Sequence, residues 1–485
     1  MTGPNDGYVS PLAQRNASKE MQAIFSPRRR FSTWRRIWHA AALAQHESGL
    51  PVTREQCDAI GAHLEITDQE IAAAAELERK LRHDVMAHVH ALGQTAPLAR
   101  PIIHLGMTSQ DVVCNADLIL IHEALDLVTL KLARAIDALA SFAARWKSLP
   151  TLGLTHLQPA QPTTVGRRAA QWAYDLWLCL DRLAYTTAFL KLRGLKGATG
   201  TQAAFVALFN GHPEKVDKLE ERFVKRFGRA RLKDEVHLLT SQTYPRVVDA
   251  FVIADLAAAA AVIHKLCNDV RILASRKEVD EPIEAEQIGS SAMPYKQNPM
   301  RCERATGLCR FVMSLVQNPL DTAATQWFER TLDDSSNRRV VLPEAFLALD
   351  GALDILHNVA SGLFVHEGMV RANLAVEMPF MMTENLILAA VRRGKDRQEA
   401  HESIRRHSRE ATVRIKDKGL PNDLLERLRA DPTFDGVDFD KVLDPAAYVG
   451  RAAEQVDRFI AEIASPVRER FAPRFDAMAT SDPGV

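Results

Sequence analysis

The sequence predicts an all-α protein, and three observations carry that prediction. Apolar residues recur at alternating steps of three and four along long stretches, which is the spacing of one face of a helix. One stretch, residues 246–276, is rich in alanine on nearly every side. Strand signals are sparse, and no hairpin dipeptide such as Asn-Gly lies between alternating runs.

Three long helices are expected in the middle of the chain. An apolar stripe from Leu118 to Phe142 predicts the first, over roughly residues 115–147. The alanine-rich stretch predicts the second, and its small side chains let neighbouring helices approach closely, so it should be central in a bundle. A stripe from Leu349 to Leu363 predicts the third, and the short polar residues at 333–337 are its N-cap candidates.

Domain boundaries are expected near Thr108 and Val365, because the long stripes lie between them. The prediction is therefore an N-terminal helical domain (1–108), a central long-helix bundle (109–364) and a small C-terminal helical domain (365–485). Heptad-like stripes favour near-parallel packing of long helices, within one chain or between chains. The C-terminal domain should hold shorter helices interrupted by Pro379, Gly394, Gly419-Leu420-Pro421 and Pro432.

Composition argues against nucleic-acid and membrane partners. The chain has 485 residues, 47% hydrophobic and 25% charged, as in an ordinary soluble globular protein. Its formal net charge is +0, so no global field attracts nucleic acid or an anionic membrane. The Arg28-Arg29-Arg30 cluster is interpreted as a solvated turn or a subunit contact. The most apolar stretch, Phe251 to Ile263, contains Asp255 and is shorter than the ~20 residues that a bilayer span needs.

Cysteine usage and the N-terminus indicate a cytoplasmic protein. The first twelve residues lack a basic segment followed by an apolar core, so no signal peptide is expected. Six cysteines are scattered without a C-x-x-C pair, which is typical of reduced, mostly buried thiols: Cys57, Cys114, Cys179, Cys267, Cys302 and Cys309.

The most informative segment is Gly289-Ser290-Ser291-Ala292-Met293-Pro294-Tyr295-Lys296-Gln297-Asn298-Pro299, which stands between two helical segments. Its prolines, glycine and paired serines cannot continue a helix or join a sheet, so it is predicted to be a polar loop that opens and closes. Hydroxyls, a lysine and an amide suit an anion with developing negative charge. An ordinary surface turn is the alternative.

Five blocks of the sequence resemble the adenylosuccinate lyase family of the fumarase/aspartase superfamily. They occur in the right order, within a resemblance that runs from about Pro11 to near Phe471: 82–88, 155–161, 197–202, 288–304 and 327–339. The resemblance implies a central bundle of five long helices. It also implies a homotetramer with a twenty-helix core and active sites shared between subunits. It further implies elimination of fumarate from adenylosuccinate, giving AMP, and from the succinylcarboxamide ribotide SAICAR, giving AICAR, in purine biosynthesis.

Such an elimination needs a base beside a carboxylate, donors around that carboxylate, and an acid for the departing nitrogen; no metal or organic cofactor is required. The resemblance makes Ser290 the general base, with Ser291 the second choice. A lone histidine such as His156 is more often structural, but the match to the Thr-His-x-Gln-Pro block makes it the general acid, oriented by Glu303. Activation of the serine would come from Lys296 and from backbone donors of the loop.

The resemblance also assigns the binding residues. Lys296 and Asn298 would hold the succinyl carboxylates, and His83 with Arg82 and Asp84 would support the acid and the phosphate end. The phosphate would be bound by Arg15, Arg330, Ser335 and Arg339. The succinyl arm would be bound by Thr108, Ser109 and Thr155. Gln242 would bind the base or carboxamide, and Arg304 falls at another binding position.

Three positions depart from the family pattern. Asn16 stands where a tyrosine is common and would weaken phosphate or ribose contacts, Gln297 replaces a common basic residue, and Cys302 replaces a common serine. None removes a catalytic group.

Two further motifs were weighed against metal and nucleotide sites. His83, His88, His90 and His104 do not form pairs that share one face at adjacent turns, and no H-E-x-x-H occurs, so no metal site is predicted. The run from Gly194 to Gly200 matches neither a dinucleotide nor a Walker motif. The resemblance places it in a loop near the active site.

Two rival functions remain open at this point. Another fumarate-releasing member, such as argininosuccinate lyase, is disfavoured by Tyr295 and by the block at 333–339. A non-enzymatic, crystallin-like structural protein is disfavoured by the joint presence of Ser290, His156 and Lys296.

Overall fold

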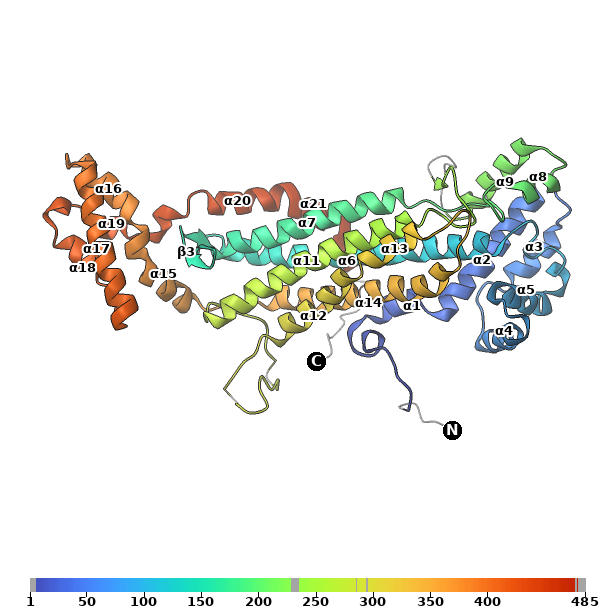
Figure 1. Cartoon of the computed structure of the whole chain (residues 1–485), viewed down its shortest axis with the longest axis horizontal. Helices are drawn as coiled ribbons and strands as arrows, with labels where there is room; N and C mark the ends of the chain where they lie inside the picture. Colours follow the sequence, from blue (N-terminus) through green and yellow to red (C-terminus); the bar gives the residue numbers. More distant parts are fainter. Residues whose placement is uncertain (1–5, 228–234, 285, 294, 476–477, 479–485) are drawn as a thin grey trace.

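The computed structural model describes residues 6–227, 235–284, 286–293, 295–475 and 478. It is an elongated molecule built almost wholly of helices, with a long bundle in the middle and a helical group at each end (Figure 1). The predicted all-α class is confirmed. The named strands are six segments of two residues that form three antiparallel pairs: β1 (Pro150–Thr151) with β4 (Thr163–Thr164), β2 (Leu154–Thr155) with β3 (Gln158–Pro159), and β5 (Val279–Asp280) with β6 (Phe364–Val365).

The central bundle consists of five long helical rods, the fifth being the pair α12 and α13. Its helices are α6 (Ser109–Trp146), α7 (Val165–Phe189), α11 (Val247–Ser275), α12 (Met300–Ser314), α13 (Gln317–Ala324) and α14 (Asp333–Gly362). α6 packs along α7 and α14, and α11 packs along α12, α7 and α14. The helices predicted over 115–147 and 246–276 are both present, and α6 begins earlier because Thr108 and Asp111 form a capping box.

Helix α11 lies inside this bundle. It spans 29 residues and is long and apolar enough to cross a bilayer by length and composition, so the prediction that this stretch is too short for a span is wrong. The helix continues past Ile263 because Val270 and Leu273 extend its apolar side. Within its most apolar window 56% of residues are buried by neighbouring helices, as in the core helix of a soluble protein. A bent pair of helices, α15 (Glu367–Met381) and α16 (Thr383–Arg392), passes the same test only if it is counted as one span.

The start of α14 differs from the prediction. The N-cap is Leu332, without a side-chain hydrogen bond, so the polar residues at 333–337 are not caps but lie in the first turns. Asp334 is buried and turned toward Arg246 and Arg330 instead of toward the free backbone N–H groups. This polar run therefore makes side-chain contacts inside the molecule and does not cap the helix.

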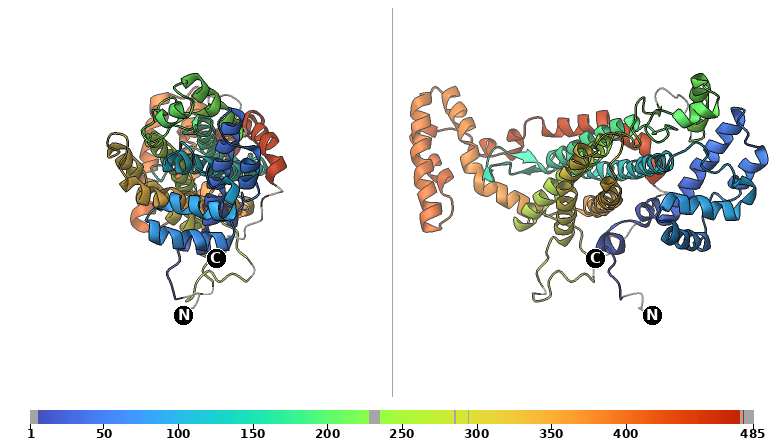
Figure 2. Two further views of the ribbon diagram at one scale, coloured as in Figure 1. Left: turned by 90° about the vertical axis from the view of Figure 1, so that its right-hand side faces the viewer. Right: turned by 45° about the vertical axis from the view of Figure 1, so that its right-hand side comes forward.

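The N-terminal group covers one end of the bundle (Figures 1 and 2). Trp34 and Trp38 are buried in the same core as the bundle, and α2 packs on α6. The elements are η1 (Leu12–Asn16), α1 (Lys19–Ile24), α2 (Pro27–Glu47), α3 (Arg54–Gly61), α4 (Asp68–Leu81), α5 (Asp84–Thr95) and η2 (Pro97–Ala99), with α8 (Ala203–Leu208) and α9 (Pro213–Lys225) beside them.

The C-terminal group at the opposite end has its own small core, but the last helices leave it (Figure 2). Its elements are α15 (Glu367–Met381), α16 (Thr383–Arg392), α17 (Arg397–Lys418), α18 (Leu424–Arg429), η3 (Pro432–Phe434), α19 (Phe439–Val442) and η4 (Pro445–Tyr448). They are followed by α20 (Ala452–Phe459), η5 (Ile460–Ala464) and α21 (Ser465–Phe475). α20 packs on α7 and α21 on α6, so the predicted 365–485 domain needs correction at its C-terminal part. Val456, Val467 and Phe471 are buried in the bundle core.

Candidate active site

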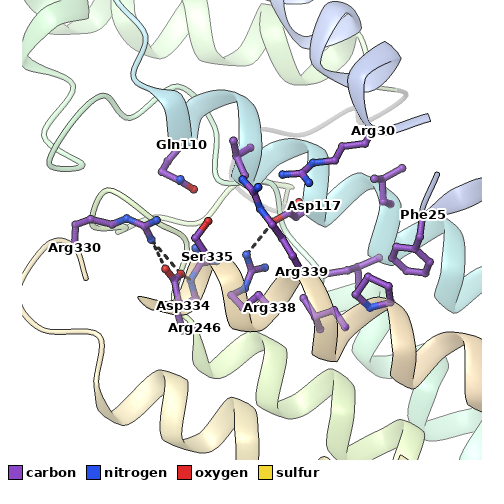
Figure 3. A pocket seen from close by; sticks show the side chains of 15 residues that line it. Phe25, Arg30, Gln110, Asp117, Arg246, Arg330, Asp334, Ser335, Arg338 and Arg339 are labelled. Atoms are coloured by element: carbon purple, nitrogen blue, oxygen red, sulfur yellow. Dashed lines mark hydrogen bonds and ion pairs between the residues drawn. The ribbon is translucent and has the colours of Figure 1, made fainter. Parts of the chain in front are cut away.

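A cavity lined by five arginines lies where α2, α6 and α14 meet (Figure 3). It has a volume of about 110 Å³ and is called the arginine cavity below. Predicted residues Arg330, Ser335 and Arg339 all line it. The other polar lining residues are Arg30, Gln110, Asp117, Arg246, Asp334 and Arg338.

Buried ion pairs hold most of these arginines in place. Asp334 accepts from Arg330 Nη1 at 2.8 Å and from Arg246 Nε at 2.8 Å. Arg338 donates to Asp249 at 2.6 Å and to Asp117 at 2.9 Å, and it also bonds the hydroxyl of buried Tyr244.

A second network orders the entrance to the cavity. Arg339 donates to Asp84 at 2.6 Å, and His83 Nε2 lies 3.3 Å from Ser109 Oγ. Burial raises the pKa of Asp84, but the hydrogen bond and charge of Arg339 outweigh it, so the net pKa is lowered. His83 is the N-cap of α5 and its Nδ1 accepts from Met86 N at 3.3 Å, which fixes the ring at the helix start.

Other predicted residues cluster around this end. Arg82 is exposed and adopts a left-handed conformation (φ 54°) where α4 ends, one residue before His83. Gln242 N donates to the Glu329 carbonyl at 3.0 Å, which places Gln242 beside the segment that carries Arg330.

The glycine-rich run at 194–200 is a structural loop rather than a phosphate loop. Its backbone N–H groups at Lys196 and Gly197 donate to the carboxylate of Asp111, at 2.8 and 3.1 Å. Asp111 is fully buried, pairs with Arg193, and accepts from Thr108 N at 2.7 Å. The loop therefore positions the first turn of α6, where Thr108 and Ser109 lie.

The signature segment forms a projecting loop, as predicted, between β5 and α12 (Figure 1). Its two ends meet where Asn298 Nδ2 donates to the Gly289 carbonyl at 2.9 Å. A Cβ at position 289 would lie 2.4 Å from the Lys296 carbonyl oxygen, so only glycine fits there. Residues 300–304, expected within the loop segment, form the first turn of α12.

Ser290 is half-buried in this loop, and Lys296 of the same loop is exposed. Its Oγ accepts from the backbone N–H of Met293 at 3.2 Å and of Ala292 at 3.4 Å. Hydrogen bonds of this kind stabilise a more negative oxygen, which is what an activated serine requires. Asn298 is engaged in closing the loop, so its amide positions the loop in this conformation.

Arg15, Asn16 and Arg304 form a separate group at the root of the loop. Arg304 donates to Asn16 Oδ1 at 2.9 Å and to the Arg15 carbonyl at 2.5 Å. Burial, together with the charge of Arg15, lowers the pKa of Arg304. All three residues line a cavity that also contains Gln287 and Met300. Arg15 therefore does not line the arginine cavity within one chain, and its role in binding the phosphate stays a prediction.

His156 and Thr155 lie at the opposite end of the bundle from His83. Both are exposed at the tight β2–β3 turn, where His156 has a φ of 54°. Figure 1 shows β3 at one end and α5 at the other. The predicted pairing of His156 with Glu303 is not made within one chain, because Glu303 accepts from Arg271 Nη2 at 3.2 Å.

The histidines weighed for a metal site have other partners. His88 stacks on Phe31 with ring centroids 3.9 Å apart, and Trp38 Nε1 donates to His104 at 3.1 Å. Burial lowers the pKa of both histidines to about 4. Over the described ranges of the chain, no group of three or more His, Cys, Asp or Glu side chains is arranged to hold a metal ion.

Sequence reasoning missed six polar residues of the arginine cavity: Arg30, Gln110, Asp117, Arg246, Asp334 and Arg338. Arg30 was interpreted with its neighbours as a solvated turn or subunit contact. Arg28 and Arg29 do pair near the surface with Asp68 and Glu123, but Arg30 faces the cavity. Its spacing of four from buried Trp34 on the same helix was a signal for an inward direction.

Comparison with known proteins supports one family. The family model described as lyase matches residues 14–314, and the model described as adenylosuccinate lyase C-terminus matches residues 379–459. The adenylosuccinate lyase of Saccharomyces cerevisiae is 49% identical over 458 residues, covering 94% of each chain. That of Schizosaccharomyces pombe is 46% identical over 478 residues, covering 98% of each chain.

A solved structure supports the fold. The 3-carboxy-cis,cis-muconate lactonizing enzyme of Pseudomonas putida is similar with a TM-score of 0.80 and 26% identity, covering 96% of this chain and 99% of that one. The sequence blocks, the helical bundle and these relatives agree. The chain belongs to the adenylosuccinate lyase family of lyases.

Proposed function

We propose that this protein eliminates fumarate from adenylosuccinate, giving AMP, and from SAICAR, giving AICAR, in purine biosynthesis in the cytoplasm. The observation that carries the proposal is the arginine cavity beside His83, Ser109 and Arg339, in a chain that is 49% identical to an adenylosuccinate lyase. A chain with no net charge concentrates arginines at this one place, as a phosphorylated substrate requires.

The chemistry assigns a role to each group. Ser290, as alkoxide, removes the proton from the carbon next to the succinyl carboxylate, and the electron pair spreads onto that carboxylate. Lys296 stabilises the resulting negative charge. The C–N bond then breaks, and His156 protonates the departing nitrogen.

Different parts of the substrate are bound by different groups of residues along the molecule. Arg330, Ser335 and Arg339 bind the phosphate, because they line one cavity whose charge suits a dianion. Thr108 and Ser109 lie at the start of α6, beside His83, and bind the succinyl arm with Thr155. Gln242 binds the base or carboxamide. Arg15, Asn16 and Arg304 extend the site from the root of the signature loop.

The site is completed between subunits of a homotetramer. Its support is that these residues lie apart in one chain. His83 caps α5 at one end of the bundle, His156 lies in the β2–β3 turn at the other end, and Ser290 lies on the projecting loop between β5 and α12 (Figure 1). Exposed apolar side chains on α7 and α11 give the bundle a face for another copy: Tyr174, Leu178, Tyr185, Phe189 and Phe251. In such a tetramer Glu303 and His156 of different chains can meet. In this proposal the three predicted domains are kept, except that residues 452–475 belong to the central bundle through which the subunits assemble.

The test is an absorbance assay of purified protein with adenylosuccinate, SAICAR and argininosuccinate, with released fumarate measured separately. Fumarate from the first two substrates and none from the third is the expected result. Fumarate release from argininosuccinate alone would identify the protein as an argininosuccinate lyase instead. No release from any of them would favour a structural role.

A further inference from the structure

The arginine cavity contains one arginine that differs from the other four. Arg246, Arg330, Arg338 and Arg339 each pair with at least one carboxylate, the four carboxylates being Asp84, Asp117, Asp249 and Asp334. Arg30 forms no ion pair with any residue that the structure describes, and its Nε is buried without a hydrogen-bond partner. The five arginines therefore outnumber by one the carboxylates that pair with them.

Arg30 is held in position by packing and not by a counter-charge. Its guanidinium carbon lies 5.2 Å from the Trp34 ring centroid and 5.9 Å from that of Phe31. Figure 3 shows its guanidinium beside that of Arg339, on the side of the cavity away from Arg330. Two like charges in a half-buried place are unfavourable without an anion between or beside them.

The electrostatics of Arg30 agree with this geometry. Burial lowers the pKa of Arg30, and the charges of Arg339 and Arg338 lower it further, against the opposing effect of Asp117 and Asp84. A second donor also awaits a partner, because Nη1 of Arg246, itself 4% exposed, is buried without a hydrogen bond from the described residues. Unpartnered buried donors are rare in folded proteins and mark a place where a ligand atom is expected.

We propose that Arg30 is a further binding residue for the substrate's phosphate, opposite Arg330 and next to Arg339. The inference rests on the proposed function, because that function supplies the phosphate monoester. Arg330 faces one edge of the phosphate group, and Arg30 beside Arg339 faces the other, so the third guanidinium selects a doubly charged phosphate over an uncharged 5′-hydroxyl. A phosphate ion free in solution has the same chemistry and is the natural probe.

The geometry predicts an unusual combination of effects for Arg30→Met. The methionine can retain apolar packing on Trp34 but has no charge, so the ligand-free protein should unfold at the same temperature or higher. Loss of a charge-assisted contact should weaken inorganic phosphate binding about tenfold or more. An arginine with a purely structural role would give the opposite pattern.

The experiment measures thermal unfolding of the full-length protein over a series of inorganic phosphate concentrations, together with phosphate inhibition of fumarate release. The wild type should be stabilised by phosphate, and phosphate should compete with both substrates. In Arg30→Met both effects should weaken by about tenfold or more, and KM for both substrates should rise by a similar factor. Arg30→Lys, which keeps a charge, should recover part of the loss.

Arg29→Met is the matched control, because Arg29 is adjacent in sequence but pairs with Glu123 outside the cavity. It should leave phosphate affinity and both KM values unchanged. Unchanged phosphate affinity in Arg30→Met, with or without a lower unfolding temperature, would overturn the inference. Weaker phosphate binding with unchanged KM would place a free-phosphate site there and would also overturn it. If the wild type binds phosphate but releases no fumarate, the proposed function fails separately from this assignment.

Discussion

At the scale of single residues, the sequence blocks identified side chains that the fold brings together in pairs. His83 contacts Ser109, Arg339 pairs with Asp84, and Arg304 contacts Asn16. These pairs join positions up to 288 residues apart, which no spacing rule could have given. The resemblance supplied them together, and the fold brings each pair into contact.

The roles of residues that depend on neighbours in three dimensions could not be predicted from the sequence. Arg30 stands in a basic triplet, and composition alone could not distinguish its inward direction from the outward direction of Arg28. Glu303 was expected to orient His156, but within one chain it contacts Arg271. A sequence block names the residue types in a site without showing which chain contributes each one.

We predict that Ser290→Ala and His156→Ala each lower kcat by at least ~10²-fold, the usual scale for losing a general base or acid. Binding should change less, because the arginines of the cavity and Lys296 remain. Steady-state kinetics on both substrates measure this. Ser291→Ala is the matched control, since Ser291 is the adjacent serine of the same loop. Near-normal turnover in Ser290→Ala, with loss in Ser291→Ala, would move the base to the neighbouring serine.

We predict that Arg339→Ala weakens binding of adenylosuccinate and SAICAR by similar factors. Both substrates carry the same ribose 5′-phosphate, and a lost charge-assisted contact costs about 1.5–3 kcal/mol, or roughly ten- to a hundredfold in affinity. Arg330→Ala should behave alike, because both arginines line the same cavity. The ratio of the two losses is the decisive measurement. A large loss for one substrate alone would place Arg339 at the base or carboxamide.

Acid should destabilise the fold through buried histidines. Burial lowers the pKa of His88 in the folded protein to about 4, below its ordinary value of 6.5, so the unfolded chain takes up the proton first as pH falls. Stability from its neutral form is present above about pH 6.5 and is lost toward pH 4, roughly 2 kcal/mol at pH 5. His88→Phe keeps the stacking on Phe31 without titrating, so its unfolding temperature should fall less between pH 7.5 and pH 5. An equal fall in both proteins would contradict this explanation.

At the scale of elements, periodicity predicted the long helices well because burial on one face imposes it. α6 and α11 appear where their stripes or alanines lie. Local rules failed where tertiary contacts compete with them. Asp334 is bonded to arginines instead of capping α14, and Pro379 lies inside α15, two residues before its end. The glycine-rich run folds around Asp111, because one buried carboxylate satisfies several backbone donors there.

The Asp111–Arg193 pair should be a strong stabiliser of the substrate end. Both side chains are fully buried, and Arg193 also donates to the Gly197 carbonyl. We predict that Arg193→Met destabilises the protein by about 3–5 kcal/mol, because it leaves a buried carboxylate without its charge partner. Chemical denaturation measures this. Lys225→Met, which breaks an exposed pair with Glu221, should lower the free energy of unfolding far less, because solvent screens that pair. Equal losses in the two variants would refute the role of burial.

At the scale of the whole molecule, the bundle could be predicted from the sequence, but the path of residues 452–475 could not. Residues 452–475 return to pack on α6 and α7, although composition placed them with the C-terminal helices. Their apolar positions are spaced as in any amphipathic helix, so the sequence does not say which surface they cover. Contacts between chains cannot be predicted from the sequence for the same reason. An apolar stripe shows that a helix face is buried, but it does not show which surface covers that face.

The long helices of the bundle hold the predicted catalytic residues of one chain at separate places. His156 and His83 lie toward opposite ends of helices up to 38 residues long, and Ser290 lies on a loop that projects from the bundle. An α-helix rises about 1.5 Å per residue, so bending α6 to join its ends would break its hydrogen bonds. We therefore predict that one chain alone is inactive and that each site combines residues of different subunits.

The direct test is to mix purified Ser290→Ala and His156→Ala proteins, each nearly inactive, under conditions where subunits exchange. Hybrid tetramers should contain some sites with both the intact serine and the intact histidine, and fumarate release should recover to a measurable fraction of the wild-type rate. Each mutant protein put alone through the same procedure should recover no fumarate release. Confirmed subunit exchange with no recovered activity would contradict the shared site.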